Sequence, residues 1–138
     1  MTIRTARPED APRMGAILSD WIDATPWMPR LHTREEDVAF CAALVAQAHV
    51  SGDLDGFIAV DGEDIPALYV ASGARRQGHG RALLDHAKSG AEHLSLWTFA
   101  ANGDALAFYA AQGFAETART DGENEERLPD VRLEWRRP

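Results

Sequence analysis

The segment ASGARRQGHGRALLDHAK, residues 71–88, places two glycines and three arginines ahead of an amphipathic pattern that predicts a helix over residues 78–90. Gly78 and Gly80 stand where that helix begins, and neither has a side chain that would keep a ligand away from the backbone. The free N–H groups of a first helical turn and the positive end of the helix dipole together bind anions. The segment therefore predicts a cradle for phosphate groups.

The arginines of this segment are a local exception in an acidic protein. The 138-residue chain has a formal net charge of −8 and a sequence pI near 5.0. General binding to nucleic acid or to an anionic membrane surface is therefore disfavoured. Any anionic ligand must be held locally, and Arg75, Arg76 and Arg81 supply charge around the cradle.

Two common nucleotide-binding motifs do not fit the segment. A P-loop requires Lys and Ser or Thr after its last glycine, but here His79 and Gly80 follow Gly78. A dinucleotide-binding fingerprint requires a third glycine where this chain has Leu83. A glycine-rich helix entry with solvated arginines is the other interpretation that this segment allows on its own.

The segment fits the pattern R/Q-x-x-G-x-G/A after a strand, ALYVA, and a second motif follows it in register. The second motif is N-x-x-A-x-x-F-Y-x-x-x-G-F, present at Asn102, Ala105, Phe108, Tyr109, Gly113 and Phe114. With both motifs and the predicted order of elements, the chain resembles the GNAT superfamily of acetyl-CoA-dependent N-acetyltransferases from residue 2 to residue 136.

Hydrophobic periodicity and turn residues predict one domain, residues 1–138, with alternating helices and strands. Helices are expected at 9–24, 33–47, 78–90 and 102–112, and strands at 2–7, 48–51, 56–60, 64–71, 94–100, 113–120 and 131–136. The resemblance implies an α/β GNAT fold. Its central sheet is mixed, mostly antiparallel and splayed at the coenzyme site, with helices on both faces.

The numbers and positions of cysteine and histidine indicate the redox environment of the protein and whether a metal site is expected. The chain has one cysteine, Cys41, at helical spacing from other apolar residues, so we expect a buried thiol and a reducing, cytoplasmic location. No sequence stretch is long and apolar enough for a membrane span. His79, His86 and His93 are seven residues apart, too far along a helix to share an ion, so no metal site is expected.

The resemblance implies acetyl-CoA as co-substrate. Its phosphates would meet the backbone amides of the cradle, and its pantetheine would lie along the open edge of the ALYVA strand. A backbone N–H near Tyr69 or Val70 would polarise the thioester carbonyl. Tyr69 is equally interpretable as a packed strand aromatic, and Asn102 is by residue type a helix cap. The coenzyme-binding positions so implied are Leu68, Tyr69, Val70, Arg75, Arg76, Gln77, Gly78, His79, Gly80, Arg81 and Asn102.

The resemblance places Tyr109 as the general acid that returns a proton to the departing thiolate. Its structural alternative is a helix aromatic that pairs with Phe108. Two side chains are candidate general bases, Asp64 at the start of the central strand and His32 in the loop after the first helix. An ordered water is the alternative to both, and Asp64 also suits a turn.

The acceptor site is expected between a proline-stiffened loop, TPWMPRLHT, and an acidic loop, GENEERLPD. Trp27, Met28 and His32 would line the pocket, and Glu125 and Glu126 would attract a primary amine of a small molecule or a peptide. The alternatives are a packed corner between helices and a solvated charged loop. The chain is long enough for one core and is expected to fold alone or as a homodimer. A noncatalytic acyl-CoA-binding module and an acidic protein-interaction domain remain alternative functions.

Overall fold

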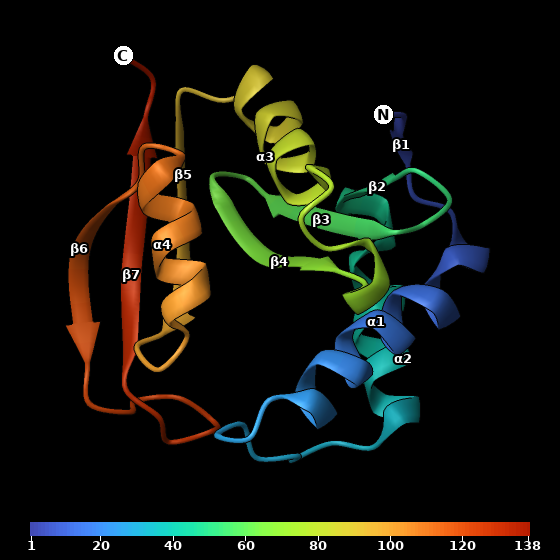
Figure 1. The fold of residues 1–138 in the computed structure, drawn as a ribbon, viewed down its shortest axis with the longest axis horizontal. Coiled ribbons are helices and arrows are strands. Elements are labelled where there is room, and N and C mark those ends of the chain that lie inside the picture. The colour runs from blue at the N-terminus through green and yellow to red at the C-terminus, as the bar shows by residue number, and fades with distance from the viewer.

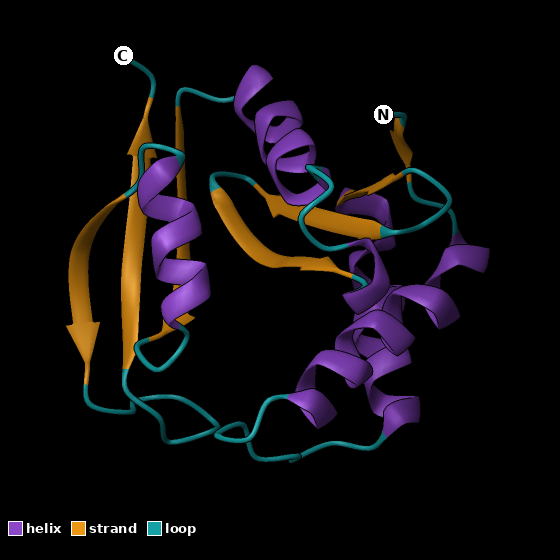
Figure 2. Cartoon of the chain, in the orientation of Figure 1, coloured by secondary structure: helices purple, strands orange, loops and turns teal.

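The computed structural model describes residues 1–138. The protein is built on one seven-stranded sheet (Figures 1 and 2). The strand order is β1-β2-β3-β4-β5-β7-β6, and every neighbouring pair is antiparallel except β4 and β5. The mixed, mostly antiparallel sheet is therefore confirmed. The strands are β1 Ile3–Thr5, β2 Ala48–Ser51, β3 Gly56–Asp61, β4 Asp64–Val70, β5 His93–Phe99, β6 Ala115–Thr120 and β7 Asp130–Arg136.

Four α-helices cover the sheet on both of its faces, as expected. They are α1 Ala11–Ala24, α2 Arg34–Leu44, α3 His79–Ser89 and α4 Gly103–Ala111. Side chains alternate along β3, so Phe57 and Ala59 join the core beneath α1 and α2, while Ile58 joins the core that includes Leu83 and Leu84 of α3. Each face of the sheet thus has its own hydrophobic core.

The sheet splits between β4 and β5, the one parallel pair. The register of this pair contains a single match, Asp64 with Ser95, and the Ser95 N–H donates to the Glu63 carbonyl at 2.8 Å. Beyond that point the two strands run apart, with β4 turning toward α1 (Figure 1). The splay implied by the sequence motifs is present, and it divides the sheet into β1–β4 and β5–β7.

A bulge in β4 contributes to this divergence. Between the pairs Asp61–Asp64 and Ala59–Ala67, β4 advances by one residue more than β3. Bulges bend and twist the strand that carries them. Pro66 lies within the bulged stretch, where its missing N–H costs no regular ladder bond.

Three smaller expectations can be compared with the structure. The helix expected to reach residue 47 ends at Leu44 and continues as a short 3-10 turn, Val45–Gln47. Cys41 is fully buried, and burial raises the pKa of its thiol to about 11, so it is an unreactive core residue. No helix has the length and apolar character needed to cross a bilayer.

Candidate active site

The split between β4 and β5 opens into a cleft of about 1020 Å³. Its walls come from β4, β5, the loop before α3, the first turns of α3 and α4, and the end of α1 with the loop that follows it. Residues that are distant in sequence therefore meet around one space. The three regions that matter chemically are the start of α3, the open edge of β4 and an aromatic wall near Trp27.

The start of α3 has the geometry of an anion cradle. Gly78 is the N-cap residue with a φ of +88°, a conformation that favours glycine, and no side chain caps the helix. The first backbone bond of the helix runs from Ala82 N–H to the Gly78 carbonyl at 3.0 Å. The N–H groups before Ala82 therefore lack an acceptor within the helix and are free to bind an anion.

The arginines around this cradle are not neutralised by the protein. Arg75 and Arg76 are exposed and form no ion pair. Arg81 lies 3.8 Å from Asp85, and both side chains are largely exposed, so this pair is weak. The positive charge of all three remains available to a ligand at the helix start.

Only the backbone N–H of His79 is available to an anion in the cradle, because its side chain points elsewhere. Its buried imidazole turns inward, with Nδ1 2.9 Å from the Ser51 hydroxyl on β2 and Nε2 3.8 Å from the Asp55 carboxylate. The imidazole thus ties the loop before α3 to the turn between β2 and β3. Gln77 does not line the main cleft; its side chain borders a smaller hollow beside α1.

The edge of β4 presents unpaired backbone groups to the cleft. Ala71 N–H donates to the Asp55 carbonyl at 2.8 Å, and these two residues stand opposite each other in the β3–β4 register. Because backbone groups of an antiparallel strand alternate in direction, Tyr69 bonds to β3 while Leu68 and Val70 direct their N–H and C=O groups toward the split. The N–H that can polarise a carbonyl in the cleft therefore belongs to Leu68 or Val70, not to Tyr69.

Tyr109 of α4 lies in the cleft as an unpaired phenol. Its ring packs between Phe108 and Phe114, with centroids at 5.1 and 5.3 Å, and the residue is 8% exposed. The hydroxyl forms no hydrogen bond within the chain. Burial, with a smaller contribution from Tyr69, raises the pKa of this phenol, so it stays protonated and can donate a proton.

The start of α3 lies close to Phe108, in the second half of α4, at Gly80. A Cβ on Gly80 would lie 3.4 Å from Phe108 Cζ and 3.8 Å from Val70 Cγ2. Asn102 lines the cleft and caps α4, because its Oδ1 accepts from the Ala105 N–H at 3.1 Å. The cap predicted from sequence is confirmed, and the Asn102 side-chain NH₂ group remains free.

Only Trp27 of the expected acceptor residues lines the cleft. Met28, His32, Glu125 and Glu126 are not among its lining residues, although they lie in the two loops that meet beside it. His32 Nε2 is 2.6 Å from Glu125, which joins the loop after α1 to the loop before β7 (Figure 1). The structure thus places these polar groups at the rim of the cleft.

Asp64 is also outside the lining of the cleft. It is exposed and begins β4 at the closed end of the split, five residues before Tyr69. At the rise of an extended strand this separation is about 16 Å. The position that suggested a catalytic carboxylate therefore lies far along the strand from the open edge at Leu68 and Val70.

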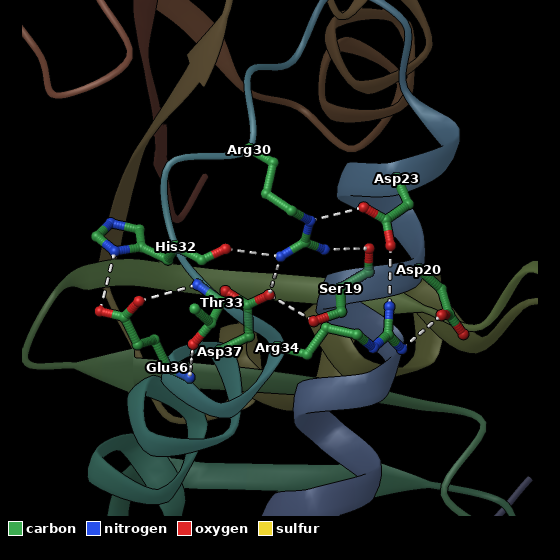
Figure 3. A network of polar contacts seen from close by, with 9 residues as sticks. All are labelled: Ser19, Asp20, Asp23, Arg30, His32, Thr33, Arg34, Glu36 and Asp37. Atoms are coloured by element: carbon green, nitrogen blue, oxygen red, sulfur yellow. Dashed lines mark hydrogen bonds and ion pairs between the residues drawn. The ribbon is translucent and has the colours of Figure 1, made fainter.

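An arginine that the sequence analysis did not select fixes the loop after α1 (Figure 3). The Arg30 guanidinium donates to Asp23 at 2.7 Å, to Asp37 at 3.0 Å and to the Ser19 carbonyl at 3.0 Å. It also donates to the His32 carbonyl within its own loop at 2.9 Å. One side chain therefore ties the loop to both α1 and α2 and holds Trp27 in place.

Two further contacts visible in Figure 3 anchor the start of α2. Thr33 and Glu36 form a reciprocal capping box at the start of the helix that was expected from residue 33. Arg34 donates to Asp20 and Asp23 of α1, each at 2.9 Å. These bonds join the two helices that flank the loop.

The contact between the two rim loops depends on the charge of His32. Glu125 chiefly, with Glu36, raises the pKa of His32, so the stabilisation is fully present below the unfolded pKa and is lost as pH rises through the raised folded pKa. We expect Glu125→Gln to lower the His32 pKa, measured by NMR titration. Glu123→Gln, a matched change in the same loop, should leave it unchanged. An unaltered titration in Glu125→Gln would contradict the contact.

Comparisons with known proteins agree with this arrangement. The sequence model of a family described as "Acetyltransferase (GNAT) domain" matches residues 35–116. Peptidyl-lysine N-acetyltransferase YiaC of Escherichia coli (strain K12) is 30% identical over 96% of this chain and 95% of its own. The solution structure of apo YjaB from Escherichia coli has a TM-score of 0.80 at 26% identity, covering 97% of this chain and 96% of that one.

A second solved structure is similar in fold at lower identity. The structure of yncA, a putative acetyltransferase from Salmonella typhimurium with its cofactor acetyl-CoA, has a TM-score of 0.72 at 20% identity over 99% of this chain and 93% of that one. The family match spans more than half of the chain, and the relative YiaC is covered almost completely. This protein is therefore an acetyltransferase that belongs to the GNAT family.

Proposed function

We propose that the protein transfers an acetyl group from acetyl-CoA directly to the side-chain amine of a lysine in a peptide or protein. The observation that carries the proposal is a single cleft with a cationic anion cradle at one end, an aromatic wall at the other and the unpaired Tyr109 phenol in its lining. A noncatalytic coenzyme-binding module would have no use for such a phenol. The two ends suit the two substrates.

The residues at the cationic end fit coenzyme A. The free N–H groups before Ala82 and the unpaired charges of Arg75 and Arg76 suit its phosphates. The open β4 edge at Leu68 and Val70 offers alternate backbone groups to an extended amide chain. When bound, the thioester supplies an activated acetyl group, and a Leu68 or Val70 N–H polarises its carbonyl.

The proton steps are assigned to Tyr109 and to water. Tyr109 holds its proton at Oη because the pKa of the phenol is raised, so it can protonate a departing thiolate. Asp64 and His32 lie outside the cleft lining, which leaves solvent in the cleft as the acceptor of the proton from the attacking amine. We therefore favour water over Asp64 and His32 as the general base.

The lysine assignment rests on the chemistry of the opposite end. Glu125 and Glu126 lie in the rim loop beside the cleft, and a net charge of −8 favours a basic peptide. The aromatic wall suits the apolar stem of a lysine. Relatives named as peptidyl-lysine N-acetyltransferases support the same class of acceptor.

We expect acetylation of an amino-terminally blocked peptide with one lysine, detected as release of the coenzyme thiol and a mass gain of one acetyl group on that lysine. A matched peptide with a free amino terminus and arginine in place of lysine should remain unmodified. Acetylation of only the free amino terminus would refute the lysine assignment.

Trp27→Ala should raise the Michaelis constant for the lysine peptide about tenfold, with the Michaelis constant for acetyl-CoA nearly unchanged. A variant impaired equally for both substrates would instead place Trp27 in the core.

A further inference from the structure

Four aromatic side chains form a continuous wall around the acceptor end of the cleft, and we call them the aromatic box. In spatial order they are Tyr69 of β4, Trp21 of α1, Trp27 of the following loop and Phe99 of β5. All four line the cleft and all are partly exposed. They therefore span the opening from one half of the split sheet to the other.

Neighbouring rings of the box lie at steep interplanar angles to one another. Trp27 is nearly perpendicular to Trp21, with an interplanar angle of 79° and centroids 6.0 Å apart. Its angle to Phe99 is 66° at 5.8 Å, and Tyr69 lies 5.5 Å from Trp21 at 55°. In an edge-to-face contact the edge of one ring covers one face of its neighbour, so the wall turns at each contact while the other faces are not covered by these neighbours.

The box is fixed by polar contacts behind it. Arg30 anchors the loop that carries Trp27 to α1 and α2 (Figure 3), and the Thr25 hydroxyl donates to the Trp21 carbonyl at 2.6 Å. Tyr69 also packs on Phe57, a fully buried core residue, at 5.8 Å. A ligand would meet rings that are already ordered, so little entropy is lost in arranging them.

The charges near the box favour a cation. Glu125 and Glu126 lie on the adjacent rim; burial chiefly raises the pKa of the Tyr69 phenol, and Glu126 is among the smaller contributions. Arg30 and Arg34, the nearby cations, are already paired with aspartates. The unpaired Arg75 and Arg76 lie at the other end of the cleft, around the cradle. Arg127, which is exposed and has no ion pair, follows Glu126 in the rim loop, but residues 121–130 of that loop carry five carboxylates against this one arginine. The net negative charge of the loop favours a cationic ligand.

We propose that the aromatic box binds alkylammonium groups by cation–π contact and therefore also takes fully methylated amines, which cannot be acetylated. The proposal rests on the proposed function, because it treats the box as the binding site of the acceptor amine. A quaternary nitrogen has no lone pair and no proton to lose, so it occupies the site without reacting. Trimethylation of a target lysine would then convert a substrate into a competitive inhibitor.

The test is an NMR titration with choline and with 3,3-dimethylbutan-1-ol, a neutral molecule of nearly the same shape. The indole N–H signals report on four tryptophans, of which Trp21 and Trp27 are in the box and Trp97 and Trp135 are not. We expect choline to shift the first two signals, with about tenfold higher affinity than the alcohol. Equal affinities, or choline shifts absent from Trp21 and Trp27, would overturn the proposal.

Two variants separate cation–π contact from apolar packing. Trp27→Leu keeps apolar bulk but removes a π face, so choline affinity should fall several-fold while that of the alcohol changes little. Trp97→Leu is the matched control, because this exposed β5 tryptophan also lines the cleft but stacks with Arg132 and forms no aromatic pair with the four rings. Choline binding that survives Trp27→Leu unchanged, or that falls equally in Trp97→Leu, would also overturn the proposal.

The titration contains neither acetyl-CoA nor a reactive amine, so its outcome is independent of catalysis. Selective choline binding together with failure to acetylate lysine peptides would refute the proposed function and leave the cation site standing. Lysine acetylation without any preference for choline over the alcohol would refute the cation site alone. The two hypotheses therefore fail separately.

Discussion

The Gly80→Glu variant is expected to lose the thermal stabilisation that acetyl-CoA gives to the wild-type protein. A ligand bound only by the folded state stabilises it by mass action, so at one hundred times its dissociation constant acetyl-CoA should raise the wild-type melting temperature by roughly 8 °C. Gly80 lies among the free N–H groups of α3, and a Cβ there would be 3.4 Å from Phe108. Glutamate adds bulk and negative charge where phosphates are expected to bind. Differential scanning fluorimetry with and without the coenzyme measures the effect.

Gly90→Glu provides the control for this prediction. Gly90 ends the same helix, and a Cβ there meets no atom within 4 Å. The charge change is identical, but it occurs at the opposite end of α3 from the cradle. This variant should keep the full shift with acetyl-CoA, although a carboxylate near a helix C-terminus lowers basal stability slightly. Retention of the wild-type shift in Gly80→Glu would place phosphate binding elsewhere.

The order of helices and strands was largely predictable because their signals are local. Alternation, helical spacing and glycine turns lie within single segments, and the meander, the helix after Gly78 and both last strands were found where expected. The cradle was equally visible, since its glycines and arginines are consecutive in the chain. The direction of the His79 side chain was not visible, because its partner Ser51 is 28 residues away.

The acceptor end was less predictable because it is assembled from distant segments. Trp21 falls within the helix expected at 9–24 and Phe99 within the strand expected at 94–100, and neither was a candidate site residue. Their contacts with Trp27 depend on how far β4 and β5 diverge. A signal was available, however: Trp21 and Trp27 are six residues apart at the end of a helix and in a proline-stiffened loop, where tryptophans seldom become fully buried.

The distance of Asp64 from the open edge of β4 could not be judged from the sequence. Asp64 was a candidate base at the start of a strand, and the structure places it at the closed end of the split, outside the lining of the cleft. The bulge of β4 at Pro66 likewise depends on the pairing with β3, which no local pattern specifies. The role of Arg30 had no local signal either, since the aspartates that it joins lie on two different helices.

Replacing Tyr109 by phenylalanine should lower turnover at saturating substrates by about 10²- to 10³-fold, the range for loss of a positioned general acid. The ring would keep its contacts with Phe108 and Phe114, and the lost hydroxyl has no hydrogen-bond partner in the chain. Folding and coenzyme affinity should therefore be nearly unchanged. Because the pKa of this phenol is raised, wild-type turnover should show no loss from its ionisation between pH 7 and 9. Steady-state rates across that range check both statements, and unchanged turnover in the variant would assign proton donation to water.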